Sequence, residues 1–393
     1  MRVGFILTDS PDIVSIDGLT SDTGFTVGSA LRSCGGNLGN LAFKKAAHML
    51  IEDQCNFLTY GSDAEYWRSR IDILVMAEAN LINHGVDYSG PADFVSTLDK
   101  PCLMLGVGAQ AKDFSNPDFS GIPEGTRRFL QEVSKRSYQV LVRGKFSKTA
   151  CKSVSIHNAI AAGCPSYLLS SEVKLWSRIL DRLKHTDILD GLVITEGVYS
   201  PPAGYDALKE VEQLLFEMVA IDHADYVGQM QGGVIAHGLN CVDEKWQKDT
   251  LNIKNYLCPR LPADRFLSIA RRRFKSFIRI DKWLRYLEKK TACIGTRVHG
   301  NLLALQSGTP AVPLTHDSRS SELCEFTGLP YFNISQVDVS NLSDFLGLFD
   351  IIRNSNARAL DDQRIQIARI YYDALKKSGI RPSDHLKVLS QLN

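Results

Sequence analysis

The sequence predicts an α/β protein with two doubly wound domains, each built on a parallel sheet, followed by a helical segment. Three observations support this fold class. The chain has 393 residues, more than one ordinary core holds. Short apolar runs alternate with helical stretches in two successive series, which is typical of parallel sheets covered by helices on both faces. Gly, Pro and Ser cluster between the two series, at residues 161–173. The expected units are residues 1–170, 171–345 and 346–393.

Composition and charge limit the classes of protein to which the chain can belong. The hydrophobic fraction is 44%, the charged fraction 23% and the formal net charge +1. These values are typical of a globular protein and give no general attraction to nucleic acid. No apolar run reaches membrane-spanning length, and the first residues, MRVGFILTDSPD, have the pattern of a strand rather than of a signal peptide. The nine cysteines contain no C-x-x-C pair. We therefore expect a cytoplasmic protein with free thiols, no metal site and no resident cofactor.

The first series predicts five strands with helices between them. One of these helices covers residues 40–53, where Leu41, Ala42, Ala46 and Leu50 fall on roughly one face. Such an apolar face packs on a sheet. The expected strands are at residues 2–7, 56–61, 72–77, 101–108 and 138–144.

The second series repeats the alternation of strand and helix and predicts a second sheet. Its expected strands are at residues 191–197, 223–229, 232–238, 291–295 and 311–316. The stretch at residues 343–379 is helical by its period. Two doubly wound domains in succession imply a cleft between them.

Ligands of doubly wound sheets bind outside the carboxyl ends of the strands, so the residues directly after each strand are candidates. The stretch GTRVHGNLLALQSGTP places Arg297 and His299 between a strand at 292–295 and a short apolar helix at 301–307. Free N–H groups and the helix dipole favour an anion at such a helix start. A guanidinium and an imidazole at the same place predict an anion site. The alternative interpretation is a structural arginine with a histidine that only caps the helix.

The following strand ends in a second basic loop, THDSRSSEL. His316 and Arg319 lie directly after this strand, again at a carboxyl end. Ser320 or Ser321 is expected to cap a helix that begins near Glu322. Arg319 is either a second anion-binding group or a solvated loop residue.

The first domain carries comparable residues after its strands. In YQVLVRGKFSKTA the strand ends on Arg143, and Ser147 is expected to start a helix. A glycine-rich stretch at 33–43 leads into the first long helix, and glycines let a backbone approach a ligand closely. The loops with Asn80 and with residues 106–110 are expected to complete this edge of the sheet.

A strongly basic run covers residues 260–290, with eleven basic and three acidic residues and a net charge of +8. Aromatic and aliphatic residues are interleaved with the charges. Two interpretations stay open. The run is either a solvated helix face or a patch that contacts a membrane surface or another polyanion.

Four of these segments together resemble the polysaccharide pyruvyl transferase family. The segment at 283–319 is similar to the family's signature region, with its G-[ST]-R-x-H-G block, short helix, G-x-P, strand and later basic residue. GGNLGNLAF resembles the family's N-terminal glycine turn, LVRGKFS its V-R-[DG]-x-x-S element, and GCPSYL its G-C-P-S element. The likeness spans most of the chain in the right order. The R-x-H-G block is fairly specific, whereas the glycine turn is not.

The resemblance implies two Rossmann-like domains in a GT-B-type arrangement and transfer of pyruvate from phosphoenolpyruvate to a sugar, usually as a cyclic ketal. By motif match, the family's catalytic residues fall on Arg143, His299 and Arg319. The chain departs from the family at Arg319, where Lys is common, at Asn40, where Asp is frequent, and at 77–80, where a glycine triplet is common. Arginine keeps the charge but favours anion binding over proton donation. Substrate-binding roles are expected for Arg297, Gly300, Asn301, His316, Ser147, Asn37, Gly39, Asn40 and Asn80.

The chemistry of this donor agrees with the residue types. Phosphoenolpyruvate carries a phosphate and a carboxylate, so at least two cationic groups are needed, and arginine binds either anion in a bidentate way. His299 is expected to act either as a general acid or base or as a donor to the phosphate. The expected partners are phosphoenolpyruvate and a glycan or lipid-linked saccharide, with membrane contact through 260–290 at the inner face of the membrane, and no nucleic acid.

Two other functions are compatible with the same sequence. A GT-B glycosyltransferase with a nucleotide-sugar donor would use the same cationic helix start for a diphosphate. It would also need an acidic residue for the ribose, and the sequence offers no clear candidate. A family member that binds glycan or donor without catalysis is the second alternative, favoured only by the departures at Asn40 and Arg319.

Overall fold

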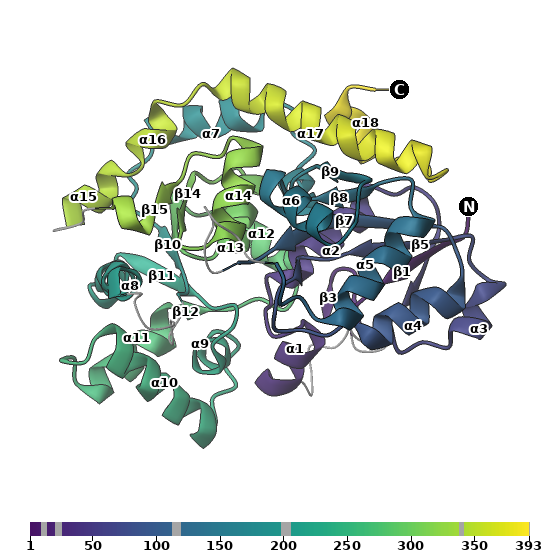
Figure 1. Cartoon of the computed structure of the whole chain (residues 1–393). Helices are drawn as coiled ribbons and strands as arrows, with labels where there is room; N and C mark the ends of the chain where they lie inside the picture. The colour runs from purple at the N-terminus through teal and green to yellow at the C-terminus, as the bar shows by residue number, and fades with distance from the viewer. Residues whose placement is uncertain (9–13, 20–25, 112–118, 198–205, 338–341, 393) are drawn as a thin grey trace.

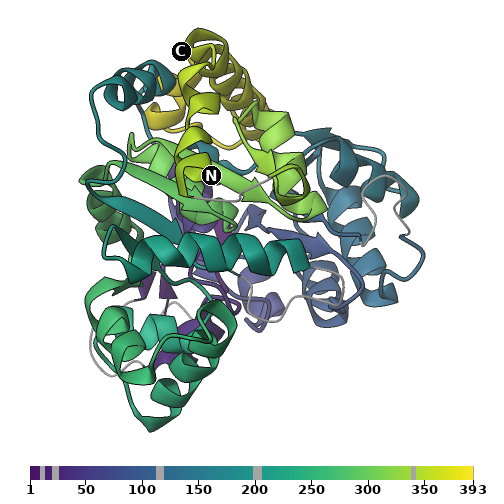
Figure 2. The same ribbon diagram turned by 90° about the vertical axis from the view of Figure 1, so that its left-hand side faces the viewer.

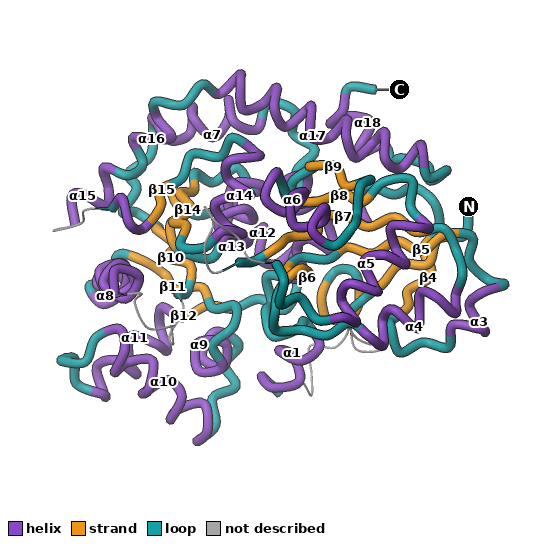
Figure 3. Tube along the Cα trace, viewed as in Figure 1, coloured by secondary structure: helices purple, strands orange, loops and turns teal. Residues whose placement is uncertain are grey.

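The computed structural model of the chain contains two parallel sheets that lie side by side, each with helices around it (Figures 1 and 3). The structure describes residues 1–8, 14–19, 26–111, 119–197, 206–337 and 342–392. The predicted fold class is confirmed, because each sheet is doubly wound and the two carboxyl edges face one cavity, as in a GT-B-type arrangement.

The first sheet belongs to the N-terminal half of the chain. Its strand order is β4-β1-β5-β7-β8-β9, with β6 paired to β7, and all of its pairings are parallel. The strands are β1 (Val3–Ile6), β4 (Cys55–Leu58), β5 (Ile73–Ala77), β6 (Asn80–Ile82), β7 (Cys102–Ala109), β8 (Val140–Val142) and β9 (Ala159–Ala161). The helices are α1 (Val27–Ser33), α2 (Asn40–Met49), α3 (Ala64–Arg68), α4 (Ser89–Leu98), α5 (Glu124–Arg136) and α6 (Lys145–Ser153).

The second sheet has the strand order β12-β11-β10-β13-β14-β15, again parallel throughout, which is the Rossmann order with its reversal between β10 and β13. The strands are β10 (Leu192–Thr195), β11 (Ala224–Val227), β12 (Phe274–Lys275), β13 (Ala292–Gly295), β14 (Ala311–Thr315) and β15 (Phe332–Asn333). The helices are α7 (Leu175–Lys184), α8 (Asp206–Ala220), α9 (Gly232–Gly238), α10 (Glu244–Leu257), α11 (Ala263–Arg273), α12 (Ile280–Glu288), α13 (Val298–Gln306) and α14 (Ser318–Thr327).

Burial on both faces explains why the strands are so apolar. Every residue of β1, β5 and β7 is buried, as parallel strands between two helix layers require. The predicted apolar face of α2 is confirmed, since Leu41, Ala42, Ala46 and Leu50 are all buried. Helices α10 and α11 lie at the end of the molecule opposite to the C-terminal helices (Figures 1 and 2).

The C-terminal helices return from the second sheet to the first (Figure 1). They are α15 (Leu342–Gly347), α16 (Asp350–Arg353), α17 (Ala357–Lys377) and α18 (Asp384–Ser390). The buried Arg364 of α17 donates to the carbonyl oxygens of Tyr167 and Glu172 in the segment between the sheets, at 3.1 and 2.6 Å. Farther on, Arg381 pairs with Asp53 at 2.9 Å. This strap fixes the two halves of the chain to each other. The domain limits at 170 and 345 stay predictions.

Smaller elements complete the fold. A hairpin of β2 (Val14–Ser15) and β3 (Gly18–Leu19) forms an isolated bridge from Gly18 to Arg279 of the second half. Two 3-10 helices are η1 (Pro165–Leu168) and η2 (Ile334–Gln336).

Three expected elements are wrong. Asn80, expected on a loop, begins strand β6, which pairs with β7. Residues 232–238, predicted as a strand, form helix α9, because Gly232 packs so closely on α10 that a Cβ there would lie 1.9 Å from Trp246. Tertiary packing thus overrides the apolar run. Residues 106–110, predicted as a loop, largely belong to β7, whose register shifts between Met104 and Val107.

Candidate active site

A cavity of about 320 Å³ lies between the carboxyl edges of the two sheets. It lies at the reversal point of the second sheet, where β10 and β13 are neighbours, which is the usual binding position in doubly wound sheets. The N-terminal half lines it with Gly35, Asn37, Asn40, Ala79, Asn80 and Arg143, and the C-terminal half with Gln229, Met230, Thr296, Arg297, Val298, His299, His316, Asp317, Arg319 and Ser320. All three residues predicted to be catalytic therefore meet at one cavity.

Arg143 lies directly after β8 and is 3% exposed. Its backbone N–H donates to the carbonyl oxygen of Val107 at 2.8 Å, which fixes the start of the side chain. The guanidinium Nε and Nη2 have no hydrogen-bonding partner among the described residues. A buried cation without a partner is costly, so these two donors are ready for an anion that enters the cavity.

Arg297 is the N-cap residue of α13, at the end of β13. Its Nη2 donates to the carbonyl oxygen of Gly197 at 2.9 Å, while Nε is buried and lacks a partner within the described ranges. The same side chain thus ties down a loop and keeps one donor free. The N–H groups in the first turn of a helix have no partner within the helix, so the start of α13 attracts negative charge at this end of the cavity.

His299 lies in the first turn of α13 and is 6% exposed. Its ring packs against Phe43 of α2, with centroids 5.7 Å apart, and its Nε2 lies 3.7 Å from the Cys164 sulfur. Burial, followed by the positive charges of Arg143 and Arg319, lowers the pKa of His299 to about 3. The imidazole is therefore neutral near pH 7 when the cavity holds no anion.

His316 and Asp317 follow β14, and Arg319 lies in the first turn of α14, for which Asp317 is the N-cap residue. Asp317 was not identified as a site residue from the sequence. Asp317 accepts from Arg319 Nε at 3.0 Å and caps α14 through the Ser320 N–H at 2.9 Å. Burial alone would raise the pKa of Asp317, but Arg319 and His316 hold it well below its usual range. Arg319 is thus held by a permanent carboxylate. The predicted caps Ser320 and Ser321 are wrong, because the helix begins at Ser318.

Burial lowers the pKa of His316, with Arg297 and Arg319 adding to the effect and Asp317 opposing it. Its Nδ1 is buried and has no partner in the described part of the chain. A neutral imidazole is therefore available beside Arg319 at the rim of the anion site.

The N-terminal wall of the cavity is built from amides. The Asn37 side chain accepts from the Gly39 N–H at 2.8 Å, and the Asn40 side chain donates to the carbonyl oxygen of Cys34 at 3.0 Å. Asn80 donates to Gln110 at 3.0 Å, while its Oδ1 is buried and unpaired among the described residues. These groups form hydrogen bonds without adding charge.

Gln229 is a cavity residue that the sequence analysis did not single out. It follows β11, and its side chain is 0% exposed, with neither Oε1 nor Nε2 partnered within the described segments. The amide lies between two glycines from the two halves. A Cβ at Gly39 would lie 2.5 Å from Oε1, and one at Gly300 would lie 2.7 Å from Nε2. Its position directly after a strand was the signal that could have identified it.

Four residues expected to bind substrate do not line the cavity. Gly39 and Gly300 instead make room for the Gln229 amide. Asn301 is fully buried and donates to the carbonyl oxygens of Gly295 and Arg297, at 2.9 and 3.0 Å, so it shapes the turn before α13. Ser147 is fully buried as well and belongs to the interface between the two halves.

The role of Ser147 is explained by Glu322 of α14. The backbone N–H and the hydroxyl of Ser147 donate to the two carboxylate oxygens of Glu322, both at 2.6 Å. Burial raises the pKa of Glu322, although these hydrogen bonds oppose the effect. Ser147 was predicted to start a helix. Helix α6 instead begins at Lys145, and Ser147 lies in its first turn. This contact joins the two halves beside Gly144, the residue that follows Arg143.

A second buried carboxylate, Glu196 after β10, holds the loop that carries Gln229. It accepts from the backbone N–H of Met230 and of Gln231. Burial raises the pKa of Glu196, with Arg297 and these N–H groups opposing. Its oxygens are thus occupied by protein groups instead of facing the cavity, from whose lining Glu196 is absent.

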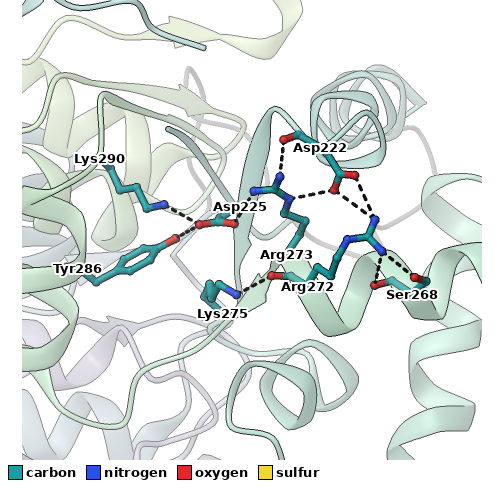
Figure 4. Close-up of polar contacts among 8 residues, drawn as sticks. All are labelled: Asp222, Asp225, Ser268, Arg272, Arg273, Lys275, Tyr286 and Lys290. Carbon is teal, nitrogen blue, oxygen red and sulfur yellow. Dashed lines mark hydrogen bonds and ion pairs between the residues drawn. The ribbon is translucent and has the colours of Figure 1, made fainter. Parts of the chain in front are cut away.

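Part of the basic run at 260–290 is paired with aspartates that lie before it in the sequence (Figure 4). Arg272 and Arg273 both bind Asp222, at 3.1 and 3.0 Å, and Lys290 binds Asp225 at 2.7 Å. Asp225 also accepts from the Tyr286 hydroxyl at 2.6 Å (Figure 4). The two aspartates lie before the run in sequence, so the charge of the segment alone overstates that of the surface. Membrane contact through this run stays a prediction.

In the described part of the chain, none of the helices has the length and apolar character that crossing a membrane requires. No group of three or more His, Cys, Asp or Glu side chains in the described ranges is placed to hold a metal ion. The expectations about metal and cofactor stay predictions.

Comparison with known proteins identifies the family. A family model described as polysaccharide pyruvyl transferase matches residues 37–318, which is most of the chain. The chain therefore belongs to the polysaccharide pyruvyl transferase family. A search of curated proteins gives no match.

Similar solved structures share little sequence with this chain. A UDP-GlcNAc 2-epimerase from Methanocaldococcus jannaschii is 11% identical, with 94% of this chain and 100% of that chain covered and a TM-score of 0.44. A putative UDP-N-acetylglucosamine 2-epimerase from Listeria monocytogenes is 12% identical, with coverages of 95% and 96% and a TM-score of 0.45. A ugt transferase from Siraitia grosvenorii is 9% identical, with coverages of 99% and 98% and a TM-score of 0.35.

Proposed function

We propose that this member of the polysaccharide pyruvyl transferase family transfers the pyruvyl group of phosphoenolpyruvate to two hydroxyls of a sugar, inside the cavity between the sheets. The observation that carries the proposal is Arg143. It is a buried guanidinium at the cavity wall, next to a helix N-terminus, and two of its donors have no partner among the residues that the structure describes. Such a group is maintained for an anion that arrives with the substrate.

The donor requires two cationic positions, and the cavity offers three. Arg143 comes from the first half, whereas Arg297 and Arg319 come from the second. Phosphoenolpyruvate carries a phosphate at one end and a carboxylate beside it, so guanidinium groups on opposite walls suit its two anionic ends. We assign Arg143 and Arg319 to these two ends and Arg297, with the first turn of α13, to the charge between them.

The acceptor requires uncharged hydrogen-bonding groups, and the cavity offers amides. Gln229 presents both a donor and an acceptor without a partner, and Asn80 presents a free acceptor, as far as the described residues show. A sugar hydroxyl both donates and accepts, so these amides suit the hydroxyl pair that forms the ketal. The sugar belongs to a polysaccharide or to its lipid-linked precursor under this proposal.

The proposed reaction balances without a cofactor. The methylene carbon of the donor gains a proton, and the first sugar hydroxyl forms a C–O bond to the neighbouring carbon. The bond from that carbon to the phosphate oxygen then breaks, and the second hydroxyl attacks the same carbon to close the ketal. The two sugar hydroxyls lose two protons in total. The methylene carbon gains one proton as it becomes a methyl group, and the released phosphate gains the other.

A ligand panel tests this proposal on the intact chain. Thermal shift and calorimetry are measured with phosphoenolpyruvate, inorganic phosphate, UDP-N-acetylglucosamine and UDP-glucose. We expect phosphoenolpyruvate to stabilise the protein more than phosphate does, and the two nucleotide sugars to have no effect at equal concentration. Stabilisation by a nucleotide sugar without stabilisation by phosphoenolpyruvate would show a glycosyltransferase or epimerase site instead.

A further inference from the structure

Three buried groups form a chain that ends on the His299 ring. The Cys164 sulfur lies 3.7 Å from His299 Nε2 and 3.0 Å from the Ser166 hydroxyl oxygen. Ser166 is 0% exposed and Cys164 is 1% exposed. Cys164 follows β9 and is the N-cap residue of η1, whereas His299 lies on α13. This series of contacts thus reaches from the first half of the molecule to His299, a cavity residue of the second half.

The direction of the two hydrogen bonds follows from the strengths of the groups. A hydroxyl is a stronger donor than a thiol, and a thiol is a weak donor and a weak acceptor. Among the described residues, the Cys164 sulfur is the partner of the Ser166 hydroxyl. We therefore orient the Ser166 O–H toward the sulfur, which leaves the Cys164 S–H to point at His299 Nε2. The ring nitrogen that accepts this hydrogen carries no proton in the neutral imidazole.

We infer that Ser166 and Cys164 hold His299 in the Nδ1–H tautomer, so that the imidazole presents an N–H donor to the cavity. The ring nitrogen that a ligand meets is set by the hydrogen bond that the other nitrogen makes. Cys164 and Ser166 are positioning residues in this arrangement, because they act on the ligand through His299. The effect on the ligand rests on the proposed function, whereas the tautomer itself does not.

This tautomer decides between the two roles that the sequence left open for His299. A neutral N–H group donates to an oxyanion but cannot accept a proton from the sugar hydroxyl at the same nitrogen. His299 therefore binds and stabilises the departing phosphate of the donor. Burial, together with the neighbouring guanidinium groups of Arg143 and Arg319, keeps the ring neutral, so the choice of tautomer controls what the cavity presents.

The test begins with the tautomer of the ligand-free protein. Two-bond ¹H–¹⁵N correlation spectra of protein labelled with ¹⁵N-histidine distinguish protonated from unprotonated ring nitrogens, and the variant His299→Asn assigns the signals. We expect Nδ1 of His299 to carry the proton and Nε2 to carry none. A proton on Nε2, or a doubly protonated ring at pH 7, would overturn the inference.

Two matched variants test how the tautomer is held. In Cys164→Ala, we expect signals of both tautomers and phosphoenolpyruvate affinity about fivefold weaker, because one neutral hydrogen bond is lost. In Cys164→Ser, the hydroxyl is a stronger donor but is held on a shorter bond, so we expect the Nδ1–H tautomer to stay the major one and the affinity to fall less than in Cys164→Ala. An unchanged tautomer in Cys164→Ala contradicts the inference, even where affinity falls. Absence of phosphoenolpyruvate binding in the wild type would contradict only the proposed function.

Discussion

The cavity and the basic run at 260–290 use the same kinds of residue in opposite ways. The run carries most of the local positive charge, yet Arg272, Arg273 and Lys290 are each bound to an aspartate (Figure 4). The cavity has far fewer cations, but Arg143 is buried with two donors unpaired within the described residues. A count of charges would therefore place an anion site at the run, whereas the free energy of binding an anion favours a site in the cavity.

The difference shows that the number of cations in a segment does not locate an anion site. An exposed ion pair contributes about 0–1 kcal/mol, and a paired guanidinium must leave its carboxylate before it binds anything else. A buried guanidinium without a partner has already lost its water, so an incoming anion regains its full hydrogen-bonding energy. Pairing and burial thus decide which cations bind a ligand.

The sharpest test exchanges one arginine from each region. Arg143→Met should weaken phosphoenolpyruvate binding by at least about 100-fold, because two charge-assisted hydrogen bonds of about 1.5–3 kcal/mol each are lost. Arg272→Met, the matched control in the basic run, should stay within about twofold of wild type. Calorimetry measures both, with circular dichroism to check the fold. Equal losses in the two variants would remove the distinction between the regions.

A smaller loss of phosphoenolpyruvate affinity is expected at Arg319, which lines the cavity and is also paired with an aspartate. Arg319 lines the cavity, but its side chain is 30% exposed and forms an ion pair with Asp317. Arg319→Gln should weaken phosphoenolpyruvate binding about tenfold, because the lost attraction is partly offset by the carboxylate already there. Calorimetry under the same conditions as for Arg143→Met ranks the two. A larger effect at Arg319 than at Arg143 would assign the main anion contact to the second half.

The neutral state of His299 predicts a dependence of stability on pH. Its folded pKa of about 3 lies below the unfolded value of about 6.5, so the unfolded chain binds a proton that the native chain does not. The contribution of the neutral ring to the free energy of unfolding is therefore fully present above about pH 7 and is lost as the pH falls toward 3. His299→Asn should therefore flatten the decline of the melting temperature between about pH 7 and 4. The exposed His223→Asn is the control, and identical slopes in both variants would contradict the buried neutral ring.

The smallest effect is expected where a pair in the run is broken. Asp222→Asn releases Arg272 and Arg273 and should lower the free energy of unfolding by about 1 kcal/mol or less. Phosphoenolpyruvate affinity should not change. Co-sedimentation with phosphatidylglycerol vesicles at low salt should increase relative to wild type, because Arg272 loses its carboxylate partner while Arg273 keeps Asp225. A change in donor affinity would show that the run is coupled to the cavity.

Much of the site could be predicted because strand ends are visible in a sequence. Arg143, His299 and Arg319 each follow a strand, and parallel strands place their carboxyl ends at one edge of each sheet. The three residues meet because the carboxyl edges of the two sheets face one cavity. Gln229 follows a strand as well, but a single glutamine after an apolar run carries no motif. Ser147 was predicted to bind substrate because it follows Arg143 in a motif, whereas its partner Glu322 lies 175 residues away.

The sequence by itself determined the fold class, the family and the cations at the strand ends, because alternating periodicity and short motifs are visible along the chain. The tertiary structure decided which cations are paired, since Asp222 lies 50 residues before Arg272 and meets it only after folding. It also decided that His299 is neutral and that its Nε2 faces Cys164, because burial and contacts between the two halves set both. Pairing and desolvation are properties of distance in space, which spacing along the chain does not record.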